Sequence, residues 1–175
     1  IIPLKLAAIR AGLGWQGKHS LLISRKFGTF LALGGIITNA HLETGKEREK
    51  NRCEKCTLCQ DACPLGALET PYILDTGKCL SKLLQSKEIT GEARSAQGNR
   101  VADCEICQTA CPWNRKHIHK PLQTKTTMAF HEKSAYWKAF FQLERLSGLS
   151  EKEYADTLGR LETGIPYSLF HRNVI

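Results

Sequence analysis

The 175-residue sequence predicts an α+β fold in three consecutive parts, and three observations indicate it. Residues 1–45 combine one helical pattern with apolar runs typical of strands. All eight cysteines lie between positions 53 and 111. The last part of the chain contains the start and stop signals of short helices. We therefore expect the parts to span 1–45, 46–120 and 121–175.

The first part begins with a helix over 3–11, because Pro3 suits a first helical turn and Gly12 suits a stop. The apolar runs 21–23 and 30–38 predict strands. Gly12, Gly14 and Gly17 match the spacing G-x-G-x-x-G, and Lys18 follows them. A dinucleotide site needs this motif after a strand and before a helix, and a phosphate loop needs Ser or Thr where His19 stands. We interpret the motif as a glycine-rich turn.

The cysteines of the second part form two runs with one cysteine between them. The first run is Cys53-x2-Cys56-x2-Cys59-x3-Cys63-Pro64, the second is Cys104-x2-Cys107-x3-Cys111-Pro112, and Cys79 stands alone. The first run has the bacterial ferredoxin spacing for a [4Fe–4S] cluster. In that pattern three thiolates hold one cluster, and the fourth, at the start of a helix whose first turn accepts the proline, serves another. The spacing therefore predicts a ferredoxin-like domain with two clusters.

Because the last cysteine of each run serves the cluster of the other run, every cysteine can be assigned to one of two clusters. One cluster takes Cys53, Cys56, Cys59 and Cys111, and the other takes Cys63, Cys79, Cys104 and Cys107. Three alternatives remain: disulfides, which suit small exported proteins, zinc, which favours two separated cysteine pairs, and one cluster with unused thiols. The sequence has no export signal and no apolar run long enough for a membrane span.

Polar segments surround the cysteines. Residues 43–52 predict a charged linker, and 83–100 predict a short helix or an insertion loop. Residues 114–127 are basic, which indicates either a linker or a strip that contacts phosphates. The net charge of +8 permits nucleic acid, anionic lipid or acidic protein partners without choosing among them.

The third part predicts successive helices. Ser134 can cap a helix that carries Trp137, Phe140 and Phe141 on one face and ends near Gly148. Ser150 and Glu153 form a capping box that opens the next helix, and Pro166 suits the start of a third. This succession suits a helical repeat that the chain contains only in part.

These residues resemble the epoxyqueuosine reductase family. The matching stretches are 11–20, with the sequence AGLGWQGKHS, the segment 27–30, the whole cysteine framework, 98–100, and Cys111-Pro112-Trp113-Asn114. His171-Arg172-Asn173-Val174 is similar to the start of that family's terminal HEAT-like repeat. The resemblance covers nearly the whole chain.

The resemblance implies a cobalamin-dependent enzyme with two [4Fe–4S] clusters. The clusters would pass electrons from a ferredoxin-type or flavodoxin-type donor to cobalamin, which would reduce epoxyqueuosine at the wobble position of tRNA to queuosine. Residues 1–45 would then be the end of a cobalamin-binding α/β domain, and the tail would be HEAT-like. The residues implied near cobalamin are His19, Ser20, Ser81, Glu105 and Ile106. The basic strip and the helical tail would hold the tRNA.

The chain also departs from the family. The proton-donating aspartate expected before the glycine-rich turn has no counterpart, because the chain opens at Ile1 without an acidic residue there. We therefore expect a fragment that lacks most of the cobalamin domain, from a cytoplasmic and monomeric protein that binds no membrane. The alternatives are a stand-alone two-cluster electron carrier and a cobalamin-dependent paralogue, reductive dehalogenase-like, with another substrate.

Overall fold

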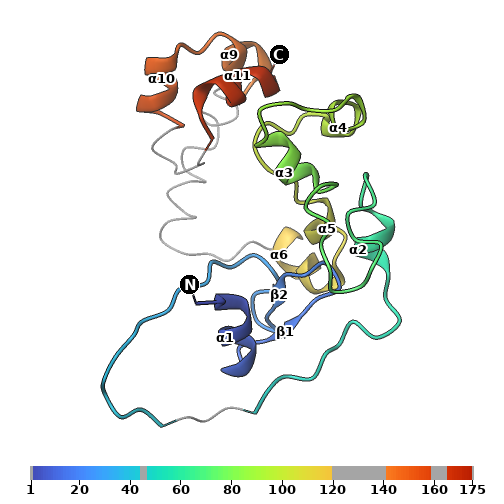
Figure 1. Ribbon diagram of the computed structural model, residues 1–175, viewed down its shortest axis with the longest axis vertical. Helices are drawn as coiled ribbons and strands as arrows, with labels where there is room; N and C mark the ends of the chain where they lie inside the picture. The colour runs from blue at the N-terminus through green and yellow to red at the C-terminus, as the bar shows by residue number, and fades with distance from the viewer. Residues whose placement is uncertain (1, 44–46, 120–140, 159–164, 175) are drawn as a thin grey trace. The chain divides into compact units, whose positions relative to one another are not determined.

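A computed structural model describes residues 2–43, 47–119, 141–158 and 165–174. It combines short helices with a small two-stranded sheet, in agreement with the mixed class expected from the sequence. The chain divides into two compact units (Figure 1). Unit 1 comprises residues 1–75 and 105–121, and unit 2 comprises residues 76–104 and 122–175. This division differs from the boundaries expected at 45 and 120, which remain a prediction.

Unit 1 begins with the expected helix, α1 (Leu4–Arg10), which starts after Pro3 and is followed by Gly12 at φ 69°. The strands β1 (Trp15–Gln16) and β2 (Leu22–Ile23) form an antiparallel hairpin beside α1 (Figure 1). A Cβ atom at Gly14 would lie 2.1 Å from the carbonyl oxygen of Ile23. The second glycine of the motif therefore lets two backbone segments approach each other, and the motif follows a helix, as expected for a turn.

The strand expected over 30–38 is wrong. The chain is irregular there, and Ile36 and Ile37 are 94% and 85% exposed. A strand needs a partner for its backbone N–H and C=O groups. Among the described residues that follow β2, the only β-type pairing is the isolated bridge between Ser24 and Gly28. An apolar run without a pairing partner therefore does not form a strand here.

Short helices of unit 1 carry or follow several of the cysteines. These are α2 (Leu58–Asp61), α5 (Ile106–Thr109), the 3₁₀ helix η1 (Pro112–Asn114) and α6 (Arg115–His119). The proline after Cys111 opens η1, as the ferredoxin pattern requires. The helix expected after Cys63 is wrong, because Pro64 lies in a turn. Gly66 follows this turn at φ 64°, a conformation that does not continue a helix.

Unit 2 contains α3 (Leu80–Leu84), α4 (Gly91–Gln97), α9 (Leu143–Ser147), α10 (Glu151–Asp156) and α11 (Tyr167–Val174). The segment 83–100 is thus helical in two places. The capping box of Ser150 with Glu153 is confirmed, and α11 follows Pro166 as expected. In Figure 1, α11 lies beside α9 and α10. The hydrophobic core of unit 2 consists of buried side chains at Leu146, Leu149, Tyr154, Leu158, Ile165, Phe170 and Val174.

Two expectations concern residues that the structure does not describe. Ser134, Trp137 and Phe140 lie outside the described residues, and so does the basic strip beyond 119. Phe141 is described and is 47% exposed. Within the described ranges, no helix has the length and apolar character needed to cross a membrane.

Candidate iron–sulfur site

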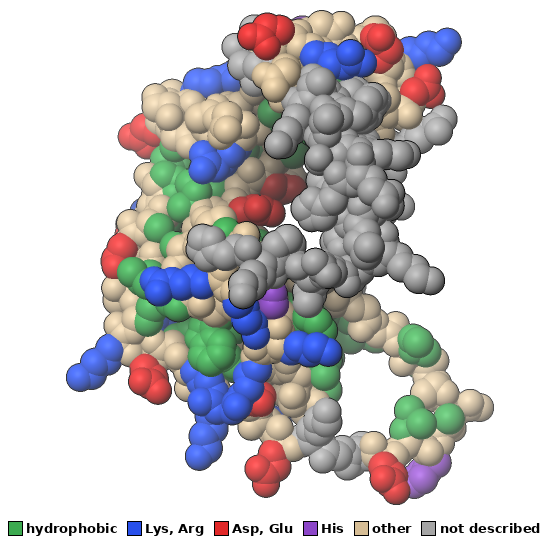
Figure 2. All heavy atoms as spheres, turned by 180° about the vertical axis from the view of Figure 1, so that it is seen from behind, with side chains coloured by type: hydrophobic (Ala, Val, Ile, Leu, Met, Phe, Trp, Pro, Cys, Tyr) green, Lys and Arg blue, Asp and Glu red, His purple; other side chains and the backbone are tan. Residues whose placement is uncertain are grey.

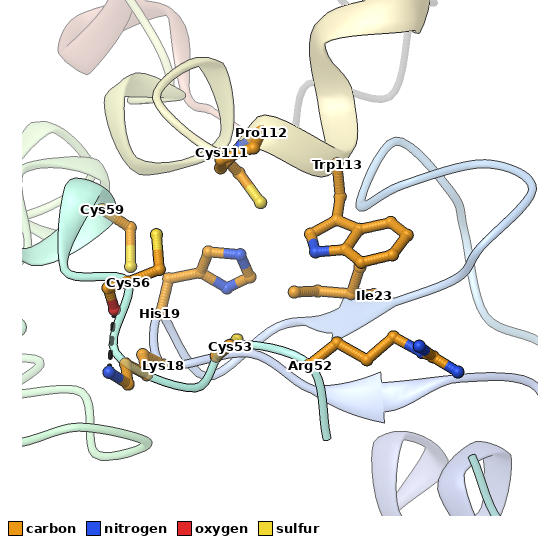
Figure 3. A pocket seen from close by; sticks show the side chains of 10 residues that line it. All are labelled: Lys18, His19, Ile23, Arg52, Cys53, Cys56, Cys59, Cys111, Pro112 and Trp113. Carbon is orange, nitrogen blue, oxygen red and sulfur yellow. Dashed lines mark hydrogen bonds between the residues drawn. The ribbon is translucent and has the colours of Figure 1, made fainter. Parts of the chain in front are cut away.

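Unit 1 gathers four cysteines around one cavity of about 420 Å³. Cys59 belongs to α2, Cys111 directly precedes η1, and Cys53 and Cys56 lie in a turn closed by a 2.8 Å hydrogen bond from the N–H of Cys56 to the carbonyl of Cys53. Helices α2 and α5 pack against each other, and this contact brings the second cysteine run to the first. The cavity, called the cysteine cavity below, therefore brings together the four residues that the spacing assigned to one cluster (Figure 3).

The two buried thiols of the cysteine cavity, those of Cys59 and Cys111, disfavour ionisation unless a cation is present. Burial raises the pKa of Cys59 to about 11, and the nearby Cys111, Cys53 and Cys56 add to the rise. Burial is also the main cause that raises the pKa of Cys111. A bound metal centre reverses this balance, because a coordinating thiol is deprotonated outright. The donor set is thus suited to a positively charged inorganic centre.

The size of the space indicates which kind of centre fits. In the described part of the chain, no three Cys, His, Asp or Glu side chains converge closely enough to share one metal ion. The four thiols surround a larger volume, which suits a cluster of several iron and sulfur atoms better than a lone tetrahedral zinc ion.

Two cations also line the cysteine cavity. Lys18 is buried, and its Nζ donates a 2.8 Å hydrogen bond to the carbonyl oxygen of Cys56. Arg52 lies next to Cys53 in the chain and approaches Glu49 at 4.0 Å. Lys18 therefore fixes the turn that presents Cys56, and both cations favour negative charge in the cavity.

His19 extends its ring into the cysteine cavity (Figure 3). The residue is 3% exposed, and burial lowers its pKa to about 4, so that the imidazole is neutral at neutral pH. Its Nδ1 accepts a 3.2 Å hydrogen bond from the N–H of Leu21, whereas its Nε2 has no partner among the described residues. His19 lines the cavity together with the four cysteines, and its implied contact with cobalamin stays a prediction.

A buried amide next to the cavity was not recognised as structural from the sequence. Asn114 is fully buried, and its Oδ1 accepts the N–H of Thr29 at 2.8 Å. Its Nδ2 donates to the hydroxyl of Thr29 and to the carbonyl of Gln108, both at 2.7 Å. A Cβ atom at Gly28, which has φ 61°, would lie 2.0 Å from Asn114 Oδ1. The sequence shows the pair Gly28-Thr29, but its role as the partner of Asn114 becomes visible only in the folded structure.

Comparison with known proteins agrees with this geometry. Residues 52–114 match the family of the 4Fe–4S double cluster binding domain. The chain is 45% identical over 80 residues to epoxyqueuosine reductase from Synechocystis sp., covering 46% of this chain and 27% of that protein. It is 43% identical over 110 residues to epoxyqueuosine reductase from Escherichia coli, covering 62% of this chain and 29% of that protein.

A solved structure extends the likeness to the fold. A crystal structure of epoxyqueuosine reductase with a tRNA-Tyr epoxyqueuosine-modified stem loop matches with a TM-score of 0.77 and 28% identity. The match covers 98% of this chain and 44% of that one. The chain is thus similar to epoxyqueuosine reductases in sequence and in fold.

The comparisons identify a two-cluster domain in the chain and show how much of the relatives' length the chain spans. The double [4Fe–4S] domain expected from the cysteine spacing is confirmed by the match over 52–114. The chain spans less than a third of the length of the two curated epoxyqueuosine reductases named above.

The four cysteines predicted to hold the second cluster are divided between the two units. Cys63 and Cys107 belong to unit 1, and Cys79 and Cys104 belong to unit 2. The Sγ of Cys63 accepts a 3.3 Å hydrogen bond from the N–H of Ala67. The assignment of these four residues to one cluster stays a prediction.

The residues implied near cobalamin divide into buried and accessible ones. Ser20 is buried in a left-handed conformation at φ 65°, and its carbonyl accepts a hydrogen bond from Lys5 Nζ. Ser20 and His19 are thus both buried. Ser81 donates a 2.7 Å hydrogen bond to Asp103 in unit 2, whereas Glu105 is exposed and precedes Ile106, which opens α5 in unit 1. The assignment of all five residues to a cobalamin contact stays a prediction.

Proposed function

We propose that this chain is the cluster-bearing part of an epoxyqueuosine reductase, the oxidoreductase that converts epoxyqueuosine to queuosine at the wobble position of tRNA. The observation that carries the proposal is the cysteine cavity in a chain that is 43% identical over 110 residues to an epoxyqueuosine reductase and matches the fold of a solved one over 98% of its length. A [4Fe–4S] cluster, when bound, accepts and passes on one electron. The four thiols, His19 and Lys18 would hold such a group away from bulk water.

The finer architecture is part of the proposal. Residues 1–45 would complete a cobalamin-binding domain, 46–120 would be the ferredoxin-like domain, and 121–175 would begin a HEAT-like repeat. Cobalamin, when bound, supplies the reductive chemistry at the substrate. Glu105, Ile106 and Ser81 would face it, and a ferredoxin-type or flavodoxin-type protein would supply the electrons. The protein would act as a monomer in the cytoplasm.

The basic residues of unit 1 support tRNA as the substrate. Arg115 and Lys116 are exposed on α6, and Lys116 Nζ donates a 2.7 Å hydrogen bond to the carbonyl of Arg25, which places it beside Arg25 and Lys26. Figure 2 shows lysine and arginine side chains at the surface of the molecule. A solved relative was crystallised with an epoxyqueuosine-modified tRNA stem loop. The strip that begins at Arg115 would contact the phosphates of such a stem loop.

The test is the nucleoside content of tRNA from a strain that lacks the full-length gene. We expect epoxyqueuosine to accumulate and to be cleared when the gene is restored. A gene with Cys111→Ala should fail to clear it, while Lys87→Ala, a change at an exposed lysine of unit 2, should restore queuosine. Normal queuosine in the deletion strain would contradict the proposal and favour the electron carrier or the paralogue with another substrate.

A further inference from the structure

The ring of His19 presents an unsatisfied polar atom to the cysteine cavity. The side chain is almost completely buried, and Nε2 has no hydrogen-bond partner among the described residues. A buried polar group without a partner is destabilising, and it indicates a ligand or a functional role. Figure 3 shows the imidazole extending between Cys56, Cys59 and Cys111 on one side and Trp113 on the other.

The hydrogen bond at the other ring nitrogen determines what Nε2 offers. Nδ1 accepts the N–H of Leu21, so Nδ1 carries no proton in this geometry. A neutral imidazole has one donor and one acceptor nitrogen. The proton therefore resides on Nε2, and the cavity receives an N–H donor.

The surrounding loop fixes the ring in this position. A Cβ atom at Gly17 would lie 2.5 Å from Cε1 and 2.9 Å from Nδ1 of His19, so the ring occupies space that only glycine leaves open. The loop closes with hydrogen bonds from Gly17 N–H to Leu21 and from Ser20 N–H to Gly17, at 2.8 and 2.9 Å. The donor is thus preorganised before any cofactor arrives.

The other buried N–H groups near the cavity are weaker candidates. Lys18 Nζ is engaged by the carbonyl of Cys56. Trp15 Nε1 is buried without a partner in the described residues, but Trp15 does not line the cysteine cavity. Among the buried side chains that line the cavity, His19 is therefore the one with an N–H that has no partner in the described residues.

We propose that His19 donates a hydrogen bond from Nε2–H to a sulfur atom of the cluster held by Cys53, Cys56, Cys59 and Cys111, and thereby raises its reduction potential. The proposal rests on the proposed ligand set but not on the identity of the substrate. Reduction adds one negative charge to the cluster, so a donor at a cluster sulfur stabilises the reduced form more than the oxidised form. Hydrogen bonds to the sulfurs are among the factors that set cluster potentials. His19 acts here as a tuning residue.

The test is a redox titration of the cluster-loaded full-length protein, followed by electron paramagnetic resonance. His19→Leu removes the donor, and we expect the ratio of reduced to oxidised cluster at a fixed potential to fall about tenfold, which equals about 59 mV for a one-electron couple. His19→Gln retains a side-chain N–H and should recover much of the loss. Trp15→Phe removes another orphaned N–H, one that does not line the cavity, and should leave the potential unchanged.

A second readout does not depend on a variant. Protein labelled with ¹⁵N-histidine and exchanged into D₂O should show a histidine nitrogen and an exchangeable deuteron coupled to the reduced cluster. Absence of both couplings in the wild-type protein overturns the proposal, even if His19→Leu fails to assemble. An unchanged potential in His19→Leu with full iron content also overturns it, as does an equal shift in Trp15→Phe. Failure of the ligand set itself would instead appear as normal iron content in Cys111→Ser.

Discussion

Unit 1 is centred on a cavity walled by sulfur, whereas unit 2 is centred on a closed group of apolar side chains. In unit 1 the buried cluster beside the cavity comprises Trp15, Ile23 and Cys111, with Trp113 packed edge-on against Trp15 at 4.8 Å between ring centroids. In unit 2, seven buried side chains from α9, α10, α11 and their connections pack together. The centre of unit 1 is thus a cavity suited to an inorganic group, whereas the centre of unit 2 is filled by its own side chains.

The two units also share a structural feature, a buried asparagine. Each uses one buried asparagine to join distant segments: Asn114 in unit 1 and Asn173 in unit 2, whose Nδ2 donates to the carbonyls of Leu84 and Val101 at 2.9 and 2.7 Å. Beside Asn173, the Arg172 guanidinium donates to the carbonyl of Leu84 at the end of α3. The difference is that Asn114 supports a cofactor cavity, whereas Asn173 supports a helical scaffold.

The comparison predicts that loss of the cluster affects unit 1 most. Cys111→Ser should remove about half of the iron, and residues 53–59 should lose their protection from hydrogen exchange, because binding of a metal centre is coupled to folding of its site. Residues 146–174, which carry the core of unit 2, should keep their protection. Iron analysis and hydrogen exchange measured by mass spectrometry check both statements.

The matched variant is Cys79→Ser, in the other predicted ligand set. It should also remove about half of the iron but leave the environment of Cys53, Cys56 and Cys59 protected. Near-normal iron content in Cys79→Ser would contradict the division of ligands.

The converse experiment removes apolar volume from unit 2. Phe170 is buried and lies 4.7 Å from Tyr154 between ring centroids. Phe170→Ala should destabilise unit 2 by about 3–5 kcal/mol, because a large buried ring leaves a cavity. Hydrogen exchange over 143–174 should report the loss, while the iron content stays normal. Ile73→Ala, at a side chain that is 61% exposed, serves as the control, and an equal effect there would refute the assignment of the core.

The asparagines allow a direct comparison of the two units. Asn114→Leu leaves the N–H of Thr29 and the carbonyl of Gln108 without partners, at about 1–3 kcal/mol for each buried group. Hydrogen exchange should therefore accelerate over 24–31 and 105–114. Asn173→Leu should instead accelerate exchange over 80–102. The same pattern in both variants would show that the units do not open independently.

The sequence predicted features that depend on near neighbours in the chain. The ferredoxin spacing grouped four cysteines that line one cavity, because three of them lie within a few residues of one another. The capping box of Ser150 was equally local. Asn114 and Thr29 are 85 residues apart, and no local pattern announces such a hydrogen bond. The run 30–38 failed for the same reason, since a strand depends on a partner that the run does not contain.

The smallest predicted effect tests the scaffold of unit 2 at its surface. Ser150→Ala removes the hydroxyl that accepts the N–H of Glu153, which should cost about 1 kcal/mol as measured by exchange over α10. Ser95→Ala, at an exposed hydroxyl inside α4, should have a much smaller effect.

The cost of removing the Ser150 cap should also depend on pH. Hydrogen bonds from Ser150 hold the pKa of Glu153 below its ordinary value. The contribution of the carboxylate is therefore complete above the ordinary glutamate pKa and is lost as the pH falls through the lower value of the folded chain. The difference between wild type and Ser150→Ala should shrink in acid, because protonated Glu153 no longer completes the capping box. A difference that stays constant with pH would mean that the hydroxyl caps α10 without help from the carboxylate.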